Sequence, residues 1–171
     1  NDISLTTTAG DIHVITITAG TANDVTLTAA AAITEDGQPA TLVTADLLTA
    51  TASGPITLDT TIATADLVST TAGAIDVDET DAIGLQSVVT QDGTITVDAG
   101  GTLTAVNVDS SATDNDANDI SLTTTAGDIA VVTITAGSAN DVTLTAAGAI
   151  TEDGDAATVV TANLLTATAD G

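Results

Sequence analysis

Residues 75–98 read IDVDETDAIGLQSVVTQDGTITVD, and this stretch indicates the fold of the whole chain. It contains two four-residue motifs, residues 75–78 and 95–98, in which aliphatic and polar side chains alternate. Alternation with a period of two is typical of a β-strand that buries one face. The Asp92-Gly93 pair between the motifs is typical of a turn. A strand that returns after about 20 residues predicts one coil of a β-solenoid.

The same motif occurs seven times in the chain, at irregular intervals. Its first and third positions are always Ile, Val or Leu, and its second and fourth positions are always polar. We therefore expect an all-β parallel β-helix of about seven coils of roughly 19–31 residues, with two aliphatic columns inside and polar rows outside. The motifs begin at Ile3, Val25, Ile56, Ile75, Ile95, Ile120 and Val142.

A second strand-like stretch follows most of the motifs. The longest interval, between Val25 and Ile56, requires an outward loop or a larger coil. We place this bulge at TEDGQP, residues 34–39. The second stretches are residues 12–18, 41–51, 62–70, 84–90 and 103–109.

A longer repeat contains the short motif. Residues 1–54 and 118–171 are identical at 45 of 54 positions when they are aligned with an offset of 117. Residues 1–117 are therefore predicted to form one full repeat unit of about five coils. Residues 118–171 then begin the next unit, with about two coils.

The composition is extreme, because the chain has no Lys, Arg, Cys or Met and no aromatic residue. A core built from small aliphatic side chains suits a thin solenoid better than an immunoglobulin-like sandwich, which commonly packs around a buried Trp. The apolar fraction of 43% argues against disorder. The net charge of −24 excludes binding to nucleic acid and to anionic membrane surfaces, since both need cationic side chains. No apolar run is long enough for membrane insertion.

Three runs of residues carry a family resemblance. They are DVTLTAAAAITEDG (residues 24–37), DVTLTAAGAITEDG (residues 141–154) and ITLDTTIATADLVSTTAGAIDV (residues 56–77). They resemble the repeat region of filamentous haemagglutinin-like exoproteins and the repeats of giant bacterial surface adhesins. The resemblance implies a right-handed parallel β-helix on the bacterial cell surface that acts as a non-catalytic adhesin stalk. Members of that family typically carry some Lys, Arg and aromatic residues, which this chain lacks.

Two other functions remain open on the residues alone. A self-assembling extracellular filament or sheath would use end-to-end or lateral self-association of like repeats, because open solenoid ends expose unpaired strand edges. An ice-binding solenoid is suggested by Thr-x-Thr pairs such as residues 26–28 and 143–145, although Asp interrupts these rows. For the stalk, a cell-surface or glycan target would be bound by regions outside this chain.

We expect no enzymatic activity. His13 is the single histidine, and the equivalent position of the second copy is Ala130. The chain contains no GxSxG, HExxH, P-loop or GxGxxG motif.

The acidic residues are the candidate functional sites. In the predicted register, Asp59, Asp78 and Asp98 occupy the fourth motif position on successive coils, with Asp76 on the same face. Opposed like charges destabilise a sheet, and no basic residue is present to neutralise them. We therefore predict Ca²⁺, which prefers carboxylate and carbonyl oxygens, as the cofactor. The alternative is a solvated acidic face with diffuse counterions. A second predicted cluster lies in a loop and comprises Asp109, Asp114, Asp116 and Asp119.

Overall fold

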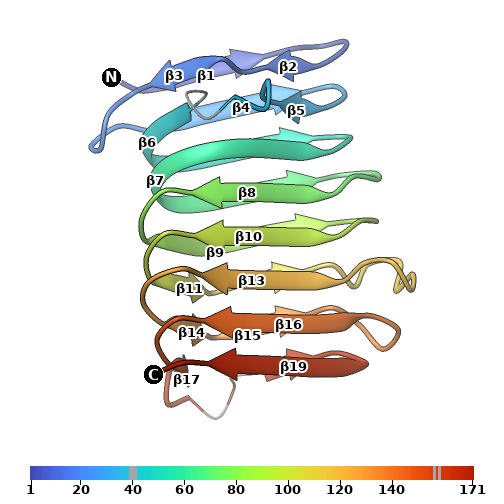
Figure 1. The fold of residues 1–171 in the computed structure, drawn as a ribbon. Helices are drawn as coiled ribbons and strands as arrows, with labels where there is room; N and C mark the ends of the chain where they lie inside the picture. The colour runs from blue at the N-terminus through green and yellow to red at the C-terminus, as the bar shows by residue number, and fades with distance from the viewer. Residues whose placement is uncertain (39–41, 156, 158) are drawn as a thin grey trace.

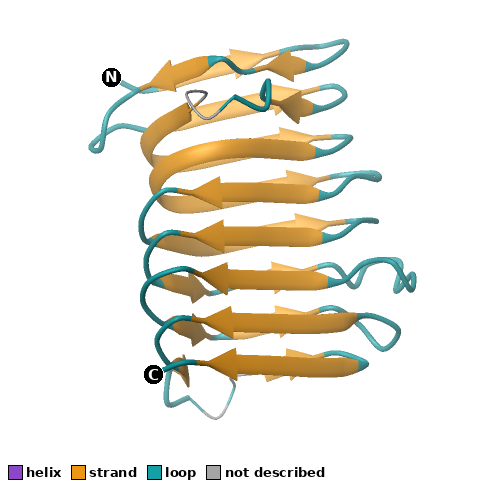
Figure 2. Ribbon diagram, viewed as in Figure 1, coloured by secondary structure: helices purple, strands orange, loops and turns teal. Residues whose placement is uncertain are grey.

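The chain forms a flattened parallel β-solenoid, seen in a computed structural model that describes residues 1–38, 42–155, 157 and 159–171 (Figures 1 and 2). The described residues form strands and loops and no helix, so no helix in them is long and apolar enough to cross a membrane. The strands are β1 (Ile3–Thr6), β2 (Ile12–His13), β3 (Thr16–Thr18), β4 (Val25–Ala29), β5 (Ile33–Thr34), β6 (Leu42–Ala52), β7 (Ile56–Ser69), β8 (Ile75–Glu79), β9 (Ile83–Thr90), β10 (Ile95–Ala99), β11 (Leu103–Ala105), β12 (Val108–Asp109), β13 (Ile120–Thr124), β14 (Ile129–Val131), β15 (Thr133–Thr135), β16 (Asp141–Ala146), β17 (Ile150–Glu152), β18 (Val159–Thr161) and β19 (Leu164–Ala169).

The strands stack in two layers, and every strand pairing among the described residues is parallel. We call one of them the front layer; it contains β2, β3, β5, β8, β10, β13, β16 and β19. The back layer contains β1, β4, β9, β11, β12, β14, β15, β17 and β18. The long strands β6 and β7 bend around one edge and contribute to both layers (Figure 1).

The number of coils follows from one column of aliphatic residues in the front layer. Each member pairs with the next one along the chain, and the steps between them define seven successive coils, so the predicted parallel β-helix is confirmed. The handedness that the family resemblance implied stays a prediction. The column consists of Ile12, Ile33, Ile56, Ile75, Ile95, Ile120, Val142 and Leu165.

The core is a thin slab of aliphatic side chains between the two layers. Alternate residues of each central strand point inward; in β8, for example, Ile75 and Val77 are fully buried while Asp76 and Asp78 are exposed. Burying one such aliphatic side chain contributes about 1.5–3 kcal/mol. Because the layers close directly on each other, the slab needs no aromatic residue to fill it.

The predicted register is wrong at one step, between the second and third motifs. Val25 pairs with Leu48 in the back layer, not with Ile56. Ile56 pairs instead with Ile33 in the front layer. The longest interval between motifs is therefore not one enlarged coil: it contains a complete coil and a crossing from one layer to the other. The bulge predicted at residues 34–39 is confirmed for residues 35–38, which form a loop, whereas Thr34 is the last residue of β5. Pro39 lies outside the described residues.

This register puts the two copies of the repeat on opposite layers. Ile3 begins the first copy in the back layer, whereas its equivalent Ile120 lies in the front layer, paired with Ile95. In Figure 1, β13 and β16 face the viewer, while β1 and β4 lie behind. The 117-residue offset therefore spans five coils and one crossing between layers, rather than the whole number of about five that the sequence suggested.

Candidate functional site

The front layer carries a row of stacked carboxyl groups. Asp59 on β7 pairs with Asp78 on β8, which pairs with Asp98 on β10. Asp76 lies two residues before Asp78 on the same outward face, between Thr57 and Thr96 of the neighbouring strands. Successive members of such a row are about 4.8 Å apart along the axis. The structure thus brings together four of the eight predicted site residues, and we call them the acidic row.

Two carboxyl groups of the acidic row, those of Asp59 and Asp76, have a raised pKa. Partial burial raises the pKa of Asp59 most, and the nearby charges of Glu35, Asp78 and Asp76 raise it further. The pKa of Asp76 is raised by burial first and then by Asp78 and Asp98. Both carboxyl groups therefore hold a proton more tightly than an isolated aspartate does.

The order of fourth motif positions predicts Thr123 and Thr145 at one end of the row and Thr6 and Thr28 at the other, and the structure confirms only the first pair. Thr123, Thr145 and Thr168 continue it toward the C-terminal coils. Thr6 and Thr28, which were expected at its other end, lie in the back layer in register with Thr51. The rows of threonines are consequently split between two faces of the molecule.

The four aspartates of the second predicted cluster do not converge on one point. Asp109 accepts hydrogen bonds from the amide and hydroxyl of Ser111 at 2.8 and 2.7 Å. Asp119 accepts the amide of Asp141 from the next coil at 2.9 Å. Asp114 contacts a turn of the next coil, and Asp116 is exposed in the loop. The residues share a loop, but each of the three with a bonded carboxyl group serves a separate contact.

Among the described residues, no group of three or more His, Asp or Glu side chains is arranged to hold a metal ion. The acidic row is a line along the solenoid axis and not a cage, because its carboxyl groups come from equivalent positions of successive strands. Binding of Ca²⁺ stays a prediction.

Other aspartates, which were not predicted as functional residues, accept backbone hydrogen bonds from the next coil. Asp11 accepts the amide of Ala32 at 2.9 Å, and its equivalent Asp128 accepts the amide of Ala149 at 2.8 Å. Asp2 accepts the amide of Asp24 in the same way. Each carboxylate thus bonds an amide at the start of the corresponding strand one coil later. The signal was present in the sequence, because these Asp residues directly precede or adjoin strand starts in both copies.

Glu79 is an inward-facing carboxyl group at the end of β8. It is 4% exposed and occupies the position between Thr60 and Ala99 of the adjacent coils. It accepts hydrogen bonds from the Thr60 hydroxyl at 2.8 Å and from the amides of Ile62 and Asp81, each at 3.1 Å. Burial raises its pKa, and these hydrogen bonds oppose the rise. The sequence pattern does not predict a functional role for Glu79, because an inward-facing carboxyl group contradicts the alternation of the strand.

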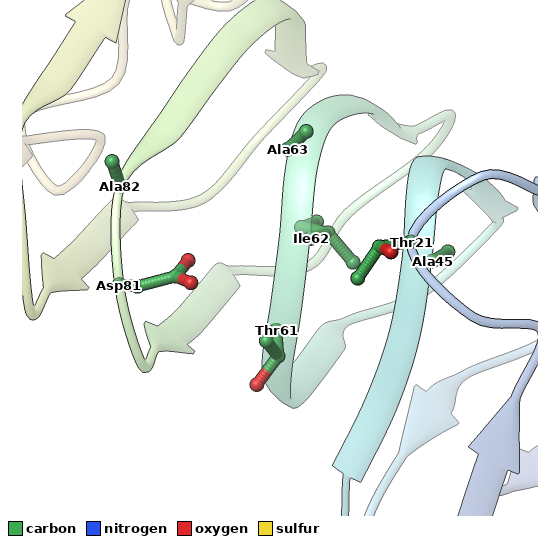
Figure 3. A pocket seen from close by; sticks show the side chains of 7 residues that line it. All are labelled: Thr21, Ala45, Thr61, Ile62, Ala63, Asp81 and Ala82. Atoms are coloured by element: carbon green, nitrogen blue, oxygen red, sulfur yellow. The ribbon is translucent and has the colours of Figure 1, made fainter.

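A shallow pocket lies where the chain bends between the layers (Figure 3). Its lining carries one carboxyl group, from Asp81, and the hydroxyl groups of Thr21 and Thr61; the rest is apolar. In Figure 3 the Asp81 side chain points from its own segment toward the side of the opening on which Thr21, Ala45 and Ile62 lie. This lining contains no pair of carboxyl groups of the kind that glycoside hydrolysis uses.

His13 is exposed on β2, with its Nδ1 3.4 Å from the Thr34 hydroxyl.

Comparison of the chain with protein-family models, with curated proteins and with solved structures found no match.

Proposed function

We propose that this chain is a repeat segment of an extracellular bacterial surface fibre, in which it serves as a non-catalytic adhesin stalk. The observation that carries the proposal is that two copies of the repeat form one uninterrupted solenoid. Across the boundary between residues 117 and 118, β13 pairs with β10, β14 with β11 and β15 with β12. No gap in strand pairing separates the units, so an array of them would extend as a rod.

The core is equally continuous across this boundary. Ile95, Ile120 and Val142 are all at most 1% exposed, although they belong to two different copies of the repeat. In a solenoid each coil is stabilised mainly by its two neighbours, so the fold lengthens without a larger core. A rod that holds a binding tip away from the cell needs this property.

The chemistry of the chain also suits a fibre outside the cell. With no Lys or Arg, the chain gives trypsin-like proteases no cleavage site, and with no aromatic residue it lacks the sites that chymotrypsin-like proteases prefer. With no Cys or Met, it has no sulfur to oxidise. These properties support a structural role in preference to an enzymatic one.

A second candidate is a filament of many stacked chains. Large aliphatic side chains are exposed at both ends of the solenoid: Leu5 and Ile15 in the first coil, and Val159, Leu164 and Leu165 in the last. The edge strands β1 and β19 also present backbone groups without a neighbouring strand in the described part of the chain. Stacking of a second copy would cover both features.

Immunoelectron microscopy of the source cells tests both candidates. We expect an antibody against this chain to label thin rods outside the cell. Label confined to the cell interior would overturn both. Denaturing electrophoresis of the isolated rods then separates the two: one very large polypeptide supports the stalk, and a ladder of small chains supports the filament.

Ice binding finds less support in the structure. The last three coils of the front layer carry Ser or Thr in both outward rows, and the three coils before them carry the acidic row. We expect no thermal hysteresis from the purified chain. A measurable hysteresis would favour this third function over the stalk.

A further inference from the structure

The structure shows one turn of the repeat twice, in two different environments. Residues 18–24 read TAGTAND and residues 135–141 read TAGSAND. The glycine has a similar positive φ in both turns, 90° at Gly20 and 97° at Gly137. In each turn the Asn side chain donates to the Ala carbonyl four residues earlier, at 2.9 Å from Asn23 and 2.7 Å from Asn140. We call residues 18–24 the open turn and residues 135–141 the covered turn.

The covered turn is bound by the loop that joins the two units, residues 110–119, which we call the strap. The carboxylate of Asp114 accepts the amide of Ser138 at 2.8 Å, its hydroxyl at 2.7 Å and the amide of Ala139 at 3.0 Å. The amide of Asn118 donates to the Asn140 side-chain oxygen at 3.0 Å. This last contact has a counterpart in the open turn, where the Asn1 amino group donates to the Asn23 side-chain oxygen at 2.7 Å. The three hydrogen bonds that Asp114 accepts are therefore what distinguishes the covered turn.

The strap is also tied to the preceding coil. The hydroxyl of Thr113 and the side-chain amide of Asn115 both donate to Asp92, at 3.2 and 3.3 Å. Within the strap, Asn118 donates to Thr113 at 2.9 Å. The strap therefore spans the boundary and holds coils on both sides of it.

Asp114 has an unusual backbone conformation. Its φ of 46° is the only positive φ of a non-glycine residue among the residues that the structure describes. Such a backbone conformation is unfavourable for most residues and persists where surrounding contacts enforce it. Here it directs the carboxylate at the covered turn.

The open turn has the same donors, without a strap. Among the described residues, no hydrogen bond reaches the amides of Thr21 and Ala22 or the Thr21 hydroxyl. Asn23 and Gly20 are partly exposed, whereas their counterparts Asn140 and Gly137 are buried. The donor set that holds Asp114 in the second copy is thus present and uncovered in the first.

We propose that the strap is the clasp between consecutive repeat units, and that its partner is the TAG-(Ser/Thr)-AND turn of the unit that follows. The open turn is then the binding surface for the strap of another copy of the same unit. This inference rests on the proposed tandem array and names the contact that joins its members.

A matched pair of glycine variants tests the clasp in the chain itself. A Cβ at Gly137 would lie 2.2 Å from Asp114 Oδ1, whereas a Cβ at Gly20 has no contact closer than 4.0 Å. The backbone strain of Gly→Ala is similar at both, because both φ angles are positive. We expect Gly137→Ala to lower the unfolding midpoint by about 3 °C more than Gly20→Ala, and Asp114→Ala to remove that difference. Equal midpoints for the two glycine variants would overturn the clasp.

Amide hydrogen exchange gives a readout that does not depend on global stability. In the unaltered chain, we expect the amides of Ser138 and Ala139 to exchange at least tenfold more slowly than those of Thr21 and Ala22. Asp114→Ala should bring the two turns to similar rates. Similar rates before the substitution would contradict the proposal.

A longer chain tests the open turn. When a further copy of residues 1–117 is fused ahead of Asn1, the amides of the original open turn should become protected from hydrogen exchange. Gly20→Ala should then lower the unfolding midpoint as much as Gly137→Ala does. An open turn that still exchanges fast would refute its assignment as the binding surface. These outcomes are independent of where the protein resides, so they are distinguishable from a failure of the stalk proposal.

Discussion

At the scale of the residue, Glu79 determines one part of the response to pH. Because burial raises its pKa in the folded chain, folding is favoured when Glu79 is protonated. Its stabilising contribution is present below the pKa of the unfolded chain and is lost as the pH rises through the folded pKa. The raised pKa values of Asp59 and Asp76 act in the same direction.

We predict that the chain is more stable at about pH 5 than at pH 7, and that Glu79→Gln reduces this difference. One unit of pKa shift corresponds to about 1.4 kcal/mol. Chemical denaturation at both pH values measures the effect, with Asp46→Asn as a control because Asp46 is exposed on β6. An unchanged pH difference in Glu79→Gln would show that this carboxyl group is not the cause.

Asp114 should respond to pH in the opposite direction. The Ser138 hydroxyl and the backbone amides of Ala139 and Ser138 lower its pKa. Its contribution to stability is therefore present above the pKa of the unfolded chain and lost as the pH falls through the folded pKa. Acid that protonates Glu79 in the core and the carboxyl groups of the acidic row would, at still lower pH, protonate Asp114 and release the strap.

The acidic row gives a second prediction at this scale. Salt should raise the unfolding midpoint, because screening weakens repulsion among Asp59, Asp78 and Asp98. If Ca²⁺ binds there as predicted, it should raise the midpoint beyond NaCl of equal ionic strength, and Asp78→Asn should cancel the excess. Identical effects of the two salts, with no heat in a calorimetric titration, would leave only diffuse counterions.

At the scale of the element, the close approach of successive coils fixes certain turn residues. Gly100 follows β10, and a Cβ there would lie 1.9 Å from the Thr80 carbonyl oxygen of the coil before. Gly84 lies within β9, where a Cβ would make ordinary contacts at 3.4 Å. We expect Gly100→Ala to cost about 2 kcal/mol or more, and Gly84→Ala to change stability by less than about 0.5 kcal/mol. Comparable losses from urea denaturation of the two variants would refute this account of the turn.

The sequence predicted most strands but missed one inward face. Strands β11 and β12 lie within the stretch that the alternation predicted, and β9 begins one residue before its stretch, since Ile, Leu and Val mark most of their buried positions. Residues 48–51, in the second half of β6, pair with the motif at residues 25–28. The sequence did not predict them as a motif because the third position is Ala50 rather than a larger aliphatic residue. A fully buried alanine carries too weak a signal to define a register.

The candidate site was predictable only where the alternation of aliphatic and polar residues is regular. The row of Asp59, Asp78 and Asp98 follows from strict alternation over strands of uniform spacing. Glu79 continues that alternation to an inward position, but a charged residue there contradicts the pattern that defines the strand. The contacts of Asp114 depend on the path of a loop, which no periodicity specifies.

At the scale of the whole molecule, the repeat of the sequence is not the repeat of the fold. A unit of five coils and one crossing reverses the layer of every residue in the next unit. In an array of such units, the acidic row would alternate between the two faces of the rod. Two units, or about eleven coils, would restore the original face and give a structural period of roughly 53 Å. Averaged electron micrographs of native rods should show this period, and a period of half that length would contradict it.

Engineered disulfides test the register on which this account depends, and the absence of native Cys makes the result unambiguous. Adjacent parallel strands hold paired residues about 4.8 Å apart, within the range that a disulfide spans. The account predicts rapid oxidation of Thr26→Cys with Thr49→Cys, and of the control pair Thr96→Cys with Ser121→Cys, because both pairs are in register. It predicts no disulfide between Thr26→Cys and Thr57→Cys, which lie on opposite layers. A disulfide in this last pair, and none between positions 26 and 49, would place both copies of the repeat on one layer and contradict the central claim.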